Sequence, residues 1–305
     1  MMSSPEGKRV LVTGAGGYVG RPTVARLLEA GCEIHALGRR DPGIPGVEFH
    51  SVDLLSAEDL GPALAAIGAS HLVHLAWSVQ PGRFWTDFQN IDWVGASLRL
   101  FRTFVEQGGR RIVGVGSCAE YDWQFPVLDE GTTPLRPSTL YGAAKRSVGD
   151  VLEALGRQES VSVAWARLFF LYGPHEPRGK LVSDTIGALL ADQRVATTPG
   201  HQKRDFLFVE DAGEALAELT MSDHRGAFNV ASGDCIPVRT LLDQIERATG
   251  KSGLIDYGAR ALAATEPLEL AAQTSRLQDE LGFRPRHTLE EGIAKTVKWW
   301  RDVAP

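Results

Sequence analysis

The fold of this chain is decided by one segment near its amino terminus, Thr13-Gly14-Ala15-Gly16-Gly17-Tyr18-Val19-Gly20. The apolar residues 9–13 before it predict a short strand, and residues 21–30 after it predict a helix that Gly31 ends. A glycine-rich turn between a strand and a helix is the context that a dinucleotide-binding fingerprint requires. The segment therefore predicts the beginning of a dinucleotide-binding domain.

Each glycine of the segment has its own predicted task. Gly14 permits the tight turn, Gly17 lets the backbone approach a pyrophosphate, and Gly20 lets the helix pack on the strand. The helix N-terminus would add amide donors and a positive dipole, and Tyr18 and Val19 are expected to contact the same ligand. The alternative is a glycine-rich turn that binds nothing.

Strand-like and helix-like segments alternate outward from this turn through the first half of the chain. Strands are predicted at 33–37, 47–51, 71–76, 111–116 and 162–169, and helices at 57–67, 92–107 and 141–156. This alternation predicts an α/β fold with a doubly wound parallel sheet. From Gly173 onward the pattern gives way to loops and short pieces, apart from a helix at 181–191. We therefore predict a Rossmann domain at 1–172 and a smaller α/β substrate domain at 173–305, with 204–231 returning to the first sheet.

The second predicted strand ends in Leu37-Gly38-Arg39-Arg40. NAD-binding chains usually place an acid there to hold the ribose hydroxyls, whereas two guanidinium groups suit a ribose phosphate. We therefore expect Arg39 and Arg40 to favour NADP(H), with NAD(H) still possible. The alternative is that both arginines are solvated surface residues and that Asp41 serves the ribose.

Further cofactor contacts are expected where the next strands end. Asp53, beside Leu54, is a candidate contact for the adenine amino group, and its alternative role is to start a helix. Leu75 and Ala76 end the fourth strand, at the edge where a parallel sheet presents its loops to a cofactor. His74 lies inside that strand and is interpreted as structural.

Composition and charge narrow the class of protein. The 305 residues include 32 Lys and Arg against 38 Asp and Glu, a formal net charge of −6, so no positive field would attract nucleic acid or an anionic membrane. No apolar run reaches about 18 residues, and the amino-terminal MMSSPEGKR carries none. We therefore expect a cytoplasmic protein with a small-molecule partner.

The three cysteines, Cys32, Cys118 and Cys235, show no CxxC motif and no ligand-like His/Cys spacing. Their number is small and odd, so neither a disulfide framework nor a zinc site is predicted. The pattern fits a reducing compartment and a protein without a metal.

Three polar residues form the candidate catalytic group. Tyr141-Gly-Ala-Ala-Lys145 places a phenol and an ammonium one helical turn apart on the same face. Ser117 follows a predicted strand that ends in Gly116. A YxxxK motif alone is common by chance, but its position after a dinucleotide fingerprint and a strand-terminal Ser makes it informative.

The sequence resembles an extended short-chain dehydrogenase/reductase of the NAD(P)-dependent nucleotide-sugar epimerase/dehydratase family. The matching segments are TGAGGYVG (13–20), HLAW (74–77), YGAAK (141–145), RLFFLYGP (167–174), RDFLFVEDAG (204–213) and LGFRP (281–285). They run through almost the whole chain. The resemblance implies a nucleotide-sugar substrate and a homodimer built on the helices that begin near Asp92 and Tyr141.

The same resemblance implies a role for each candidate catalytic residue. Tyr141 is expected to be the acid/base, Lys145 to lower its pKa and bind the nicotinamide ribose, and Ser117 to hydrogen-bond the reacting oxygen. A phenol with an ordinary pKa near 10 is a poor base at neutral pH, so a neighbouring ammonium and an oxidised nicotinamide would help it ionise.

Two residues depart from the family pattern on the substrate side. Phe170 stands where many relatives have an Asn that helps to hold the nucleotide sugar, so phosphate recognition is expected to rely more on Arg204 and backbone amides. Trp77 replaces the small residue that usually follows HLA. It is a candidate wall of a sugar pocket, with Phe84, Trp85 and Trp123, although plain packing is equally compatible with each ring.

The expected reaction is reduction of a keto group on an activated sugar, or the reverse. The alternatives are a C4 epimerase that retains its cofactor and, from another class, a redox-sensing protein that has lost catalysis. A 4,6-dehydratase is not expected, because Cys118 and Ala119 occupy the positions where those relatives carry the acid that eliminates water. Glu120 lies one place later, and its alternatives are a carboxylate that fixes the loop or a substrate contact.

Overall fold

The computed structural model describes residues 7–56 and 59–303. Residues 1–6, part of the amino-terminal stretch without an apolar run, lie outside the described part, and so do Ala57 and Glu58, where the sequence predicts the start of a helix. Within the described part, no helix is long and apolar enough to cross a membrane.

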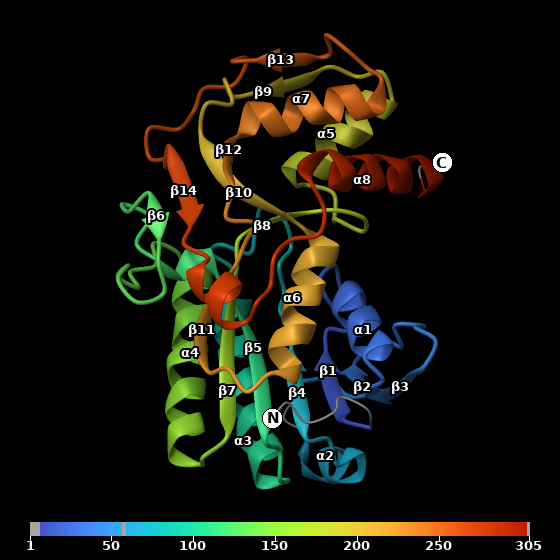
Figure 1. Ribbon diagram of the computed structural model, residues 1–305, viewed down its shortest axis with the longest axis vertical. Helices are drawn as coiled ribbons and strands as arrows, with labels where there is room; N and C mark the ends of the chain where they lie inside the picture. Colours follow the sequence, from blue (N-terminus) through green and yellow to red (C-terminus); the bar gives the residue numbers. More distant parts are fainter. Residues whose placement is uncertain (1–6, 57–58, 304–305) are drawn as a thin grey trace.

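Seven parallel strands form the main sheet, in the order β11-β7-β5-β4-β1-β2-β3 (Figure 1). They are β1 Arg9–Thr13, β2 Glu33–Gly38, β3 Val47–Ser51, β4 His71–His74, β5 Arg111–Ser117, β7 Ser162–Leu168 and β11 Gly226–Val230. The central strands are buried on both faces, which is why they read as nearly continuous apolar runs. The predicted doubly wound parallel sheet is confirmed.

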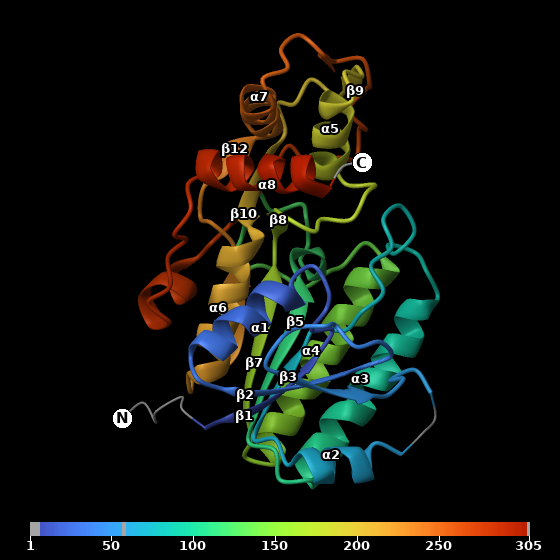
Figure 2. The same cartoon turned by 90° about the vertical axis from the view of Figure 1, so that its right-hand side faces the viewer.

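Helices cover both faces of this sheet, as the edge-on view shows (Figure 2). One face carries α1 Gly20–Glu29 and α6 Val209–Met221, and the other carries α2 Gly61–Ile67, α3 Gln89–Glu106 and α4 Leu140–Gln158. Alternate residues of each strand supply the two cores. Val10 and Val12 pack with α1, and Leu11 packs on the opposite side among residues of α2 and α3.

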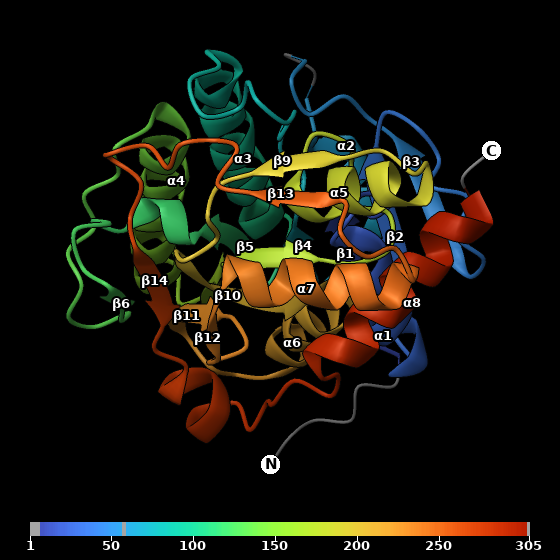
Figure 3. The ribbon, with the colours of Figure 1, turned by 90° about the horizontal axis from the view of Figure 1, so that it is seen from above.

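A second group of elements lies over the carboxyl end of the main sheet (Figure 3). Its five-stranded sheet contains β6 Val127–Leu128, β8 Phe170–Tyr172, β10 Lys203–Phe208, β12 Cys235–Pro237 and β14 Glu269–Ala272, and a two-stranded sheet contains β9 Val195–Thr197 and β13 Ile255–Tyr257. Helices α5 Leu181–Leu190, α7 Val238–Thr249 and α8 Leu289–Val303 share one apolar core with residues of β8, β9, β10, β12 and β13. This group covers the edge at which the main sheet presents its loops.

The predicted return of 204–231 to the main sheet is only partly what the structure has. Helix α6 and strand β11 do join the first domain, but residues 203–208 form β10, which pairs in parallel with β8. The predicted strand 162–169 agrees with β7, which ends at Leu168, and the separate strand β8 begins at Phe170. The apolar pattern of a strand shows that it is buried but not which sheet it joins.

Helices α1 and α6 pack closely against each other at Gly213. A Cβ atom there would lie 2.7 Å from backbone atoms of Pro22 and Thr23. Gly213→Ala should therefore force the two helices apart and lower the free energy of unfolding by about 1–3 kcal/mol, the usual cost of overpacking. Urea denaturation measures this change.

Gly95→Ala is the matched control, because Gly95 also lies inside a helix but a Cβ there would meet only an Arg99 side-chain nitrogen at 3.5 Å. It should leave stability unchanged or raise it by up to about 1 kcal/mol. Equal stability of the two variants would contradict the close contact between α1 and α6.

Candidate active site

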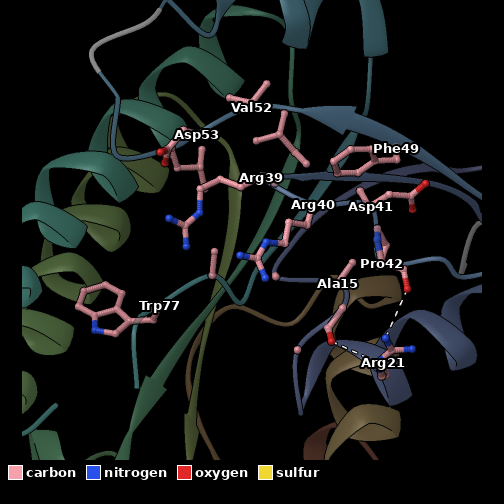
Figure 4. Close-up of a pocket in the computed structure, with 18 of the residues that line it drawn as sticks. Ala15, Arg21, Arg39, Arg40, Asp41, Pro42, Phe49, Val52, Asp53 and Trp77 are labelled. Carbon is pink, nitrogen blue, oxygen red and sulfur yellow. Dashed lines mark hydrogen bonds between the residues drawn. The ribbon is translucent and has the colours of Figure 1, made fainter. Parts of the chain in front are cut away.

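A cavity of about 520 Å³ opens where β1, β2 and β4 end (Figure 4). Strand β1 lies between β2 and β4, so successive strands are added to opposite sides of β1, and this change in strand order marks the point where doubly wound sheets bind ligands. The walls come from the glycine segment and from the ends of β2, β3 and β4. They include Gly14, Ala15, Gly16, Gly17, Arg21, Leu37, Arg39, Arg40, Asp41, Phe49, Asp53, Leu54, Ala76, Trp77 and Trp93.

The glycine segment has the close contacts that its sequence predicts. Gly14 has a φ of +74°, and a Cβ there would lie 2.8 Å from the backbone nitrogen of Ala76. A Cβ on Gly20 would lie 2.1 Å from the carbonyl oxygen of Gly14. Gly17 is exposed at the beginning of α1. The segment thus forms a backbone cradle at a helix N-terminus, which suits the phosphates of a dinucleotide.

His74 holds the ends of β1 and β4 together. Its Nδ1 lies 2.8 Å from the hydroxyl of Thr13, and its Nε2 lies 2.8 Å from the hydroxyl of Ser97 on α3. Burial lowers the pKa of His74 to about 3, with a further contribution from the charge of Lys145. The imidazole is therefore neutral and structural in this arrangement.

The two arginines after β2 are exposed and extend from the strand end across the cavity (Figure 4). The carboxylate of Asp41 accepts a hydrogen bond from the backbone nitrogen of Gly43, which shapes the following turn. Arg21, which belongs to none of the candidate site motifs in the sequence, also lines the cavity and donates to the carbonyl oxygens of Gly16 and Pro42. The cavity wall is therefore rich in guanidinium groups.

Of the other expected cofactor contacts, some line the cavity and some lie away from it. Asp53 and Leu54 line the cavity, and the Asp53 carboxylate also accepts from the backbone nitrogen of Leu55. Leu75 and Val19 pack against the buried core of the first domain instead. Tyr18 lies outside the cavity lining, with the ammonium of Lys180 5.6 Å from its ring centre, and burial raises the pKa of its phenol.

Ser117 lies in a turn that is held in place by hydrogen bonds to Ala119 and Glu120. Its hydroxyl accepts a hydrogen bond from the backbone nitrogen of Ala119, and its own backbone nitrogen donates to Oε1 of Glu120 at 2.8 Å. The Glu120 carboxylate also accepts from Nε of Arg167 at 2.8 Å and from Nε1 of Trp165 at 3.0 Å. Glu120 is fully buried. These contacts favour the role in which Glu120 fixes the loop over the role of a substrate contact.

The beginning of α4 brings Tyr141 to this turn. Thr139 caps the helix by accepting from the backbone nitrogen of Gly142, and a Cβ on Gly142 would lie 2.2 Å from the carbonyl oxygen of Ala119. Only a glycine at this position lets the helix start so close to the Ser117 turn. Burial raises the pKa of the Tyr141 phenol well above its usual range, and a hydrogen bond with Ser117 opposes this effect.

Lys145 lies one helical turn further along α4. Its Nζ donates to the carbonyl oxygen of Val115 at 2.8 Å and lies 3.9 Å from the ring centre of Trp77. Burial lowers the pKa of Lys145 to about 7. Here burial is the main influence on the Tyr141 pKa, and Lys145 is engaged with a backbone carbonyl, so the expected lowering of the Tyr141 pKa by Lys145 beside a bound nicotinamide stays a prediction.

Aromatic rings surround the phenol of Tyr141. Trp77, Phe84 and Trp85 meet it edge-on, with ring centres 6.5, 4.9 and 5.8 Å from its own. The Trp77 indole is held by a 2.9 Å hydrogen bond to Asn90 and stacks on Trp93 at 6.0 Å. Because Trp77 also lines the cavity, its ring lies between the cavity and the Tyr141–Lys145 pair.

Phe170 and Arg204 come together on the second sheet. The guanidinium of Arg204 lies 5.5 Å from the ring centre of Phe170, and it forms an ion pair with Glu266. Their strands β8 and β10 pair directly, although the two residues are far apart in the sequence. The charge of Arg204 also acts on Cys118 beside Ser117. Arg204, one of these two candidate substrate residues, therefore acts on the Ser117 turn from the second sheet.

Comparison with known proteins places this architecture in a family. The sequence profile described as the NAD dependent epimerase/dehydratase family matches residues 10–231, more than half of the chain. The chain belongs to this family.

Relatives and solved structures agree with this placement. The chain is 28% identical over 315 residues to a dTDP-glucose 4,6-dehydratase of Streptomyces griseus, covering 95% of this chain and 93% of the relative. It is 24% identical to a UDP-glucuronic acid decarboxylase 1 of Xenopus tropicalis, covering 98% and 74%. The structure of MoeE5 in complex with UDP-glucose and NAD is 27% identical, with a TM-score of 0.83 over 97% of this chain and 100% of that one.

Several site residues of this family member could not be selected from the sequence. Arg167 lies in RLFFLYGP and carried a signal only as part of that motif, while Trp165 reads as an ordinary apolar strand residue. Asn90 is a single amide near a helix start, and Trp93 reads as a core aromatic. Each acquires its place in the site through a contact with a distant residue.

The buried ammonium of Lys145 gives this family member a measurable pH dependence of stability. The pKa falls from 10.5 to about 7 on folding, so between these values the unfolded chain binds more protons than the folded one. The free energy of unfolding should therefore rise with pH above about 7, with a slope from this group of up to about 1.4 kcal/mol per pH unit. Lys145→Met should remove that contribution between pH 7.5 and 9.5, as measured by urea denaturation at each pH.

The matched control is Lys298→Met, because Lys298 is exposed on α8. It should keep the wild-type slope. Parallel stability curves for wild type and Lys145→Met would show that Lys145 titrates at its ordinary value in the folded protein.

Proposed function

We propose that this chain is an NAD(P)-dependent oxidoreductase that reduces a keto group on a nucleotide-activated sugar, with Tyr141 as the proton donor. The observation that carries the proposal is the hydrogen bond between Ser117 and Tyr141, with Lys145 one turn further along α4. The family to which the chain belongs is described as NAD dependent. Family membership supports the general type of activity. The choice of ketoreduction rests on the residues of this chain.

The backbone cradle around Gly14 and Gly17 would hold the phosphates of the dinucleotide, with Asp53 and Leu54 at the adenine end. We assign Lys145 to the nicotinamide ribose, which requires its ammonium to exchange the Val115 carbonyl for ribose hydroxyls. When bound, the nicotinamide supplies or accepts a hydride. Trp77 must move or serve as a wall in that state, because its ring lies between the cavity and Lys145.

Tyr141 is suited to donate a proton at neutral pH. Burial among aromatic rings raises the pKa of its phenol, so the hydroxyl stays protonated until an oxygen with developing negative charge lies beside it. Ser117 is fixed by the Glu120 turn and is assigned to hydrogen-bond that same oxygen. The aromatic cage of Trp77, Phe84 and Trp85 keeps water from the phenol.

The sugar substrate is proposed from the relatives and from the second domain. The solved structures of MoeE5 contain UDP-glucose and, in a second complex, UDP-glucuronic acid. In this proposal Arg204, which lies over the ring of Phe170, supplies a cation for the diphosphate, and Trp77, which meets Tyr141 edge-on, forms a wall against which the sugar can stack. We further propose that residues 173–305 are mainly substrate-binding.

Ketoreduction is favoured over elimination by the turn after Ser117. Burial raises the pKa of the Cys118 thiol to about 12, and Ala119 has no ionisable group, so neither supplies the acid that a dehydratase uses there. Glu120 is bound to Arg167 and Trp165 beneath the turn. The second candidate is a C4 epimerase, which needs the same Tyr141 chemistry and is represented among the relatives by a UDP-glucose 4-epimerase of Lacticaseibacillus casei, 23% identical.

A second copy of this chain is the other proposed partner. Helices α3 and α4 pack side by side on one face of the main sheet, and they expose Ile91 (57%) and Val151 (47%). An apolar surface on two neighbouring helices is suited to a four-helix interface.

The first test is a panel of UDP- and dTDP-sugars, including 4-keto-6-deoxy compounds, assayed with NADPH and NADH. Wild-type protein should consume reduced cofactor with a keto sugar, and Tyr141→Phe should lower kcat by about 100-fold to 10,000-fold, because it removes the proton donor. Dinucleotide binding by Tyr141→Phe, measured by fluorescence titration, should stay nearly unchanged.

Other outcomes of this panel discriminate between the candidates. Protein that is purified with tightly bound NAD(H) and interconverts C4 epimers supports the epimerase. A 4-keto-6-deoxy product formed from a nucleotide hexose would contradict the prediction that the turn after Ser117 lacks the acid that a dehydratase needs. Full activity of Tyr141→Phe contradicts the mechanism.

The second test concerns cofactor choice. Arg39 and Arg40 extend across the cavity, so we expect tighter binding of NADPH than of NADH. Replacing both by Ala should weaken NADPH binding by up to about 1.5–3 kcal/mol for each charged hydrogen bond lost and leave NADH binding nearly unchanged. Calorimetric titration measures both, and equal wild-type affinities would assign the arginines to the solvated surface.

A further inference from the structure

Two histidines and two glutamates meet on one face of the main sheet at its β3 edge. The parallel register of β2 and β3 pairs His35 with Glu48 and places His50 two residues further along β3. Glu33 lies two residues before His35 on β2. Side chains two apart on a strand point to the same face, so all four carboxylate and imidazole groups lie together.

The atoms of this group are spaced as metal ligands are. Nδ1 of His35 and Nε2 of His50 lie 2.9 Å apart, Oε2 of Glu48 lies 3.8 Å from the first, and Oε1 of Glu48 lies 3.6 Å from the second, so that one atom from each residue can be chosen within 4.8 Å of the others. In a tetrahedral zinc site with bonds of about 2.0–2.1 Å, neighbouring ligand atoms are separated by about 3.3 Å. The observed distances fall on both sides of this value, so small side-chain rotations suffice to make three bonds.

A neighbouring carboxylate orients the buried histidine. Nε2 of His35 lies 3.0 Å from Oε1 of Glu33, which also forms a 3.0 Å ion pair with Nε of Arg9. Because a carboxylate accepts, Nε2 carries the proton and the lone pair of Nδ1 faces His50 and Glu48. A histidine whose far nitrogen donates to a carboxylate is the usual arrangement around a protein-bound metal.

The solvent exposure of these three side chains and the chemistry of their ligand atoms both suit a metal ion that exchanges with solvent. The side chain of His35 is 4% exposed, that of His50 24% and that of Glu48 65%, so the group opens to solvent on the Glu48 side. Water can therefore complete the coordination. Two imidazole nitrogens and one carboxylate match zinc and similar transition metals, whereas calcium and magnesium prefer oxygen ligands alone.

We propose that His35, Glu48 and His50 form a binding site for a divalent transition-metal ion of the zinc type, with Glu33 as the residue that positions His35. The ion would join β2 to β3, the strand at the edge of the sheet. Both strands continue toward the dinucleotide cavity, where Leu37 and Phe49 line the wall. The site is separate from Tyr141 and Lys145 and does not depend on the proposed reaction.

The test uses full-length, untagged protein freed of metal with a chelator. Calorimetric titration with zinc chloride should give one saturable site, and cobalt chloride should give the visible absorption of a four-coordinate Co²⁺ ion. His50→Gln and Glu48→Gln should each weaken zinc binding at least 10-fold, and Glu33→Gln should weaken it about 10-fold to 100-fold, as loss of an orienting carboxylate does.

Controls separate this site from adventitious binding. His201→Gln and Glu106→Gln replace exposed residues outside the group and should bind zinc as the wild type does. Zinc should also raise the melting temperature of wild type and controls but not of His50→Gln. Absence of a saturable site, or unchanged zinc affinity in both His50→Gln and Glu48→Gln, would overturn the proposal and leave a hydrogen-bonded histidine pair. The cobalt spectrum of the wild type decides the matter even if a variant fails to fold.

Discussion

The buried ion pair between Glu120 and Arg167 is the interaction on which the region around Ser117 and Tyr141 depends. Both groups are almost completely removed from water, where an unpaired charge would be costly. Glu120 reaches back to the Ser117 backbone, and Arg167 also donates to the hydroxyl of Tyr121. One ion pair therefore fixes the turn that carries Ser117 and ties the end of β5 to β7.

The same network extends into the second domain. The Tyr121 hydroxyl donates to Asn229 on β11, whose side-chain amide donates to the carbonyl oxygens of Leu128 and Gln273. Leu128 ends β6, and Gln273 follows β14 of the five-stranded sheet. A continuous set of buried hydrogen bonds thus connects the Ser117 turn to the five-stranded sheet, and each member satisfies a polar group that would otherwise be unpaired.

Close approach of backbone segments is the second requirement of the site. A side chain on Gly116 would collide with the carboxylate of Glu120, and one on Gly142 would collide with the Ser117 turn. The small residues make room for the buried ion pair and for the start of α4. The buried charge of Lys145 then has a lowered pKa because the packing that brings it to the site also removes water from it.

The sequence by itself determined what depends on neighbouring residues. The segment 13–20 predicted the strand, turn and helix correctly because turn geometry and helix capping are local, and the alternation of apolar segments identified the main sheet. The spacing of Tyr141 and Lys145 placed both on one helical face for the same reason. These features need no knowledge of distant contacts.

Tertiary structure alone decided the rest, because strand pairing joins residues that are far apart in the chain. It assigned 203–208 to the second sheet, so that Arg204 lies over Phe170, and it placed Trp77 between the cavity and Lys145. The register of β2 against β3 brought His35 to Glu48 and His50, a group that no sequence motif had indicated. A one-residue shift in that register would move the β3 residues of this group to the opposite face, which is why it could be recognised only in the folded sheet.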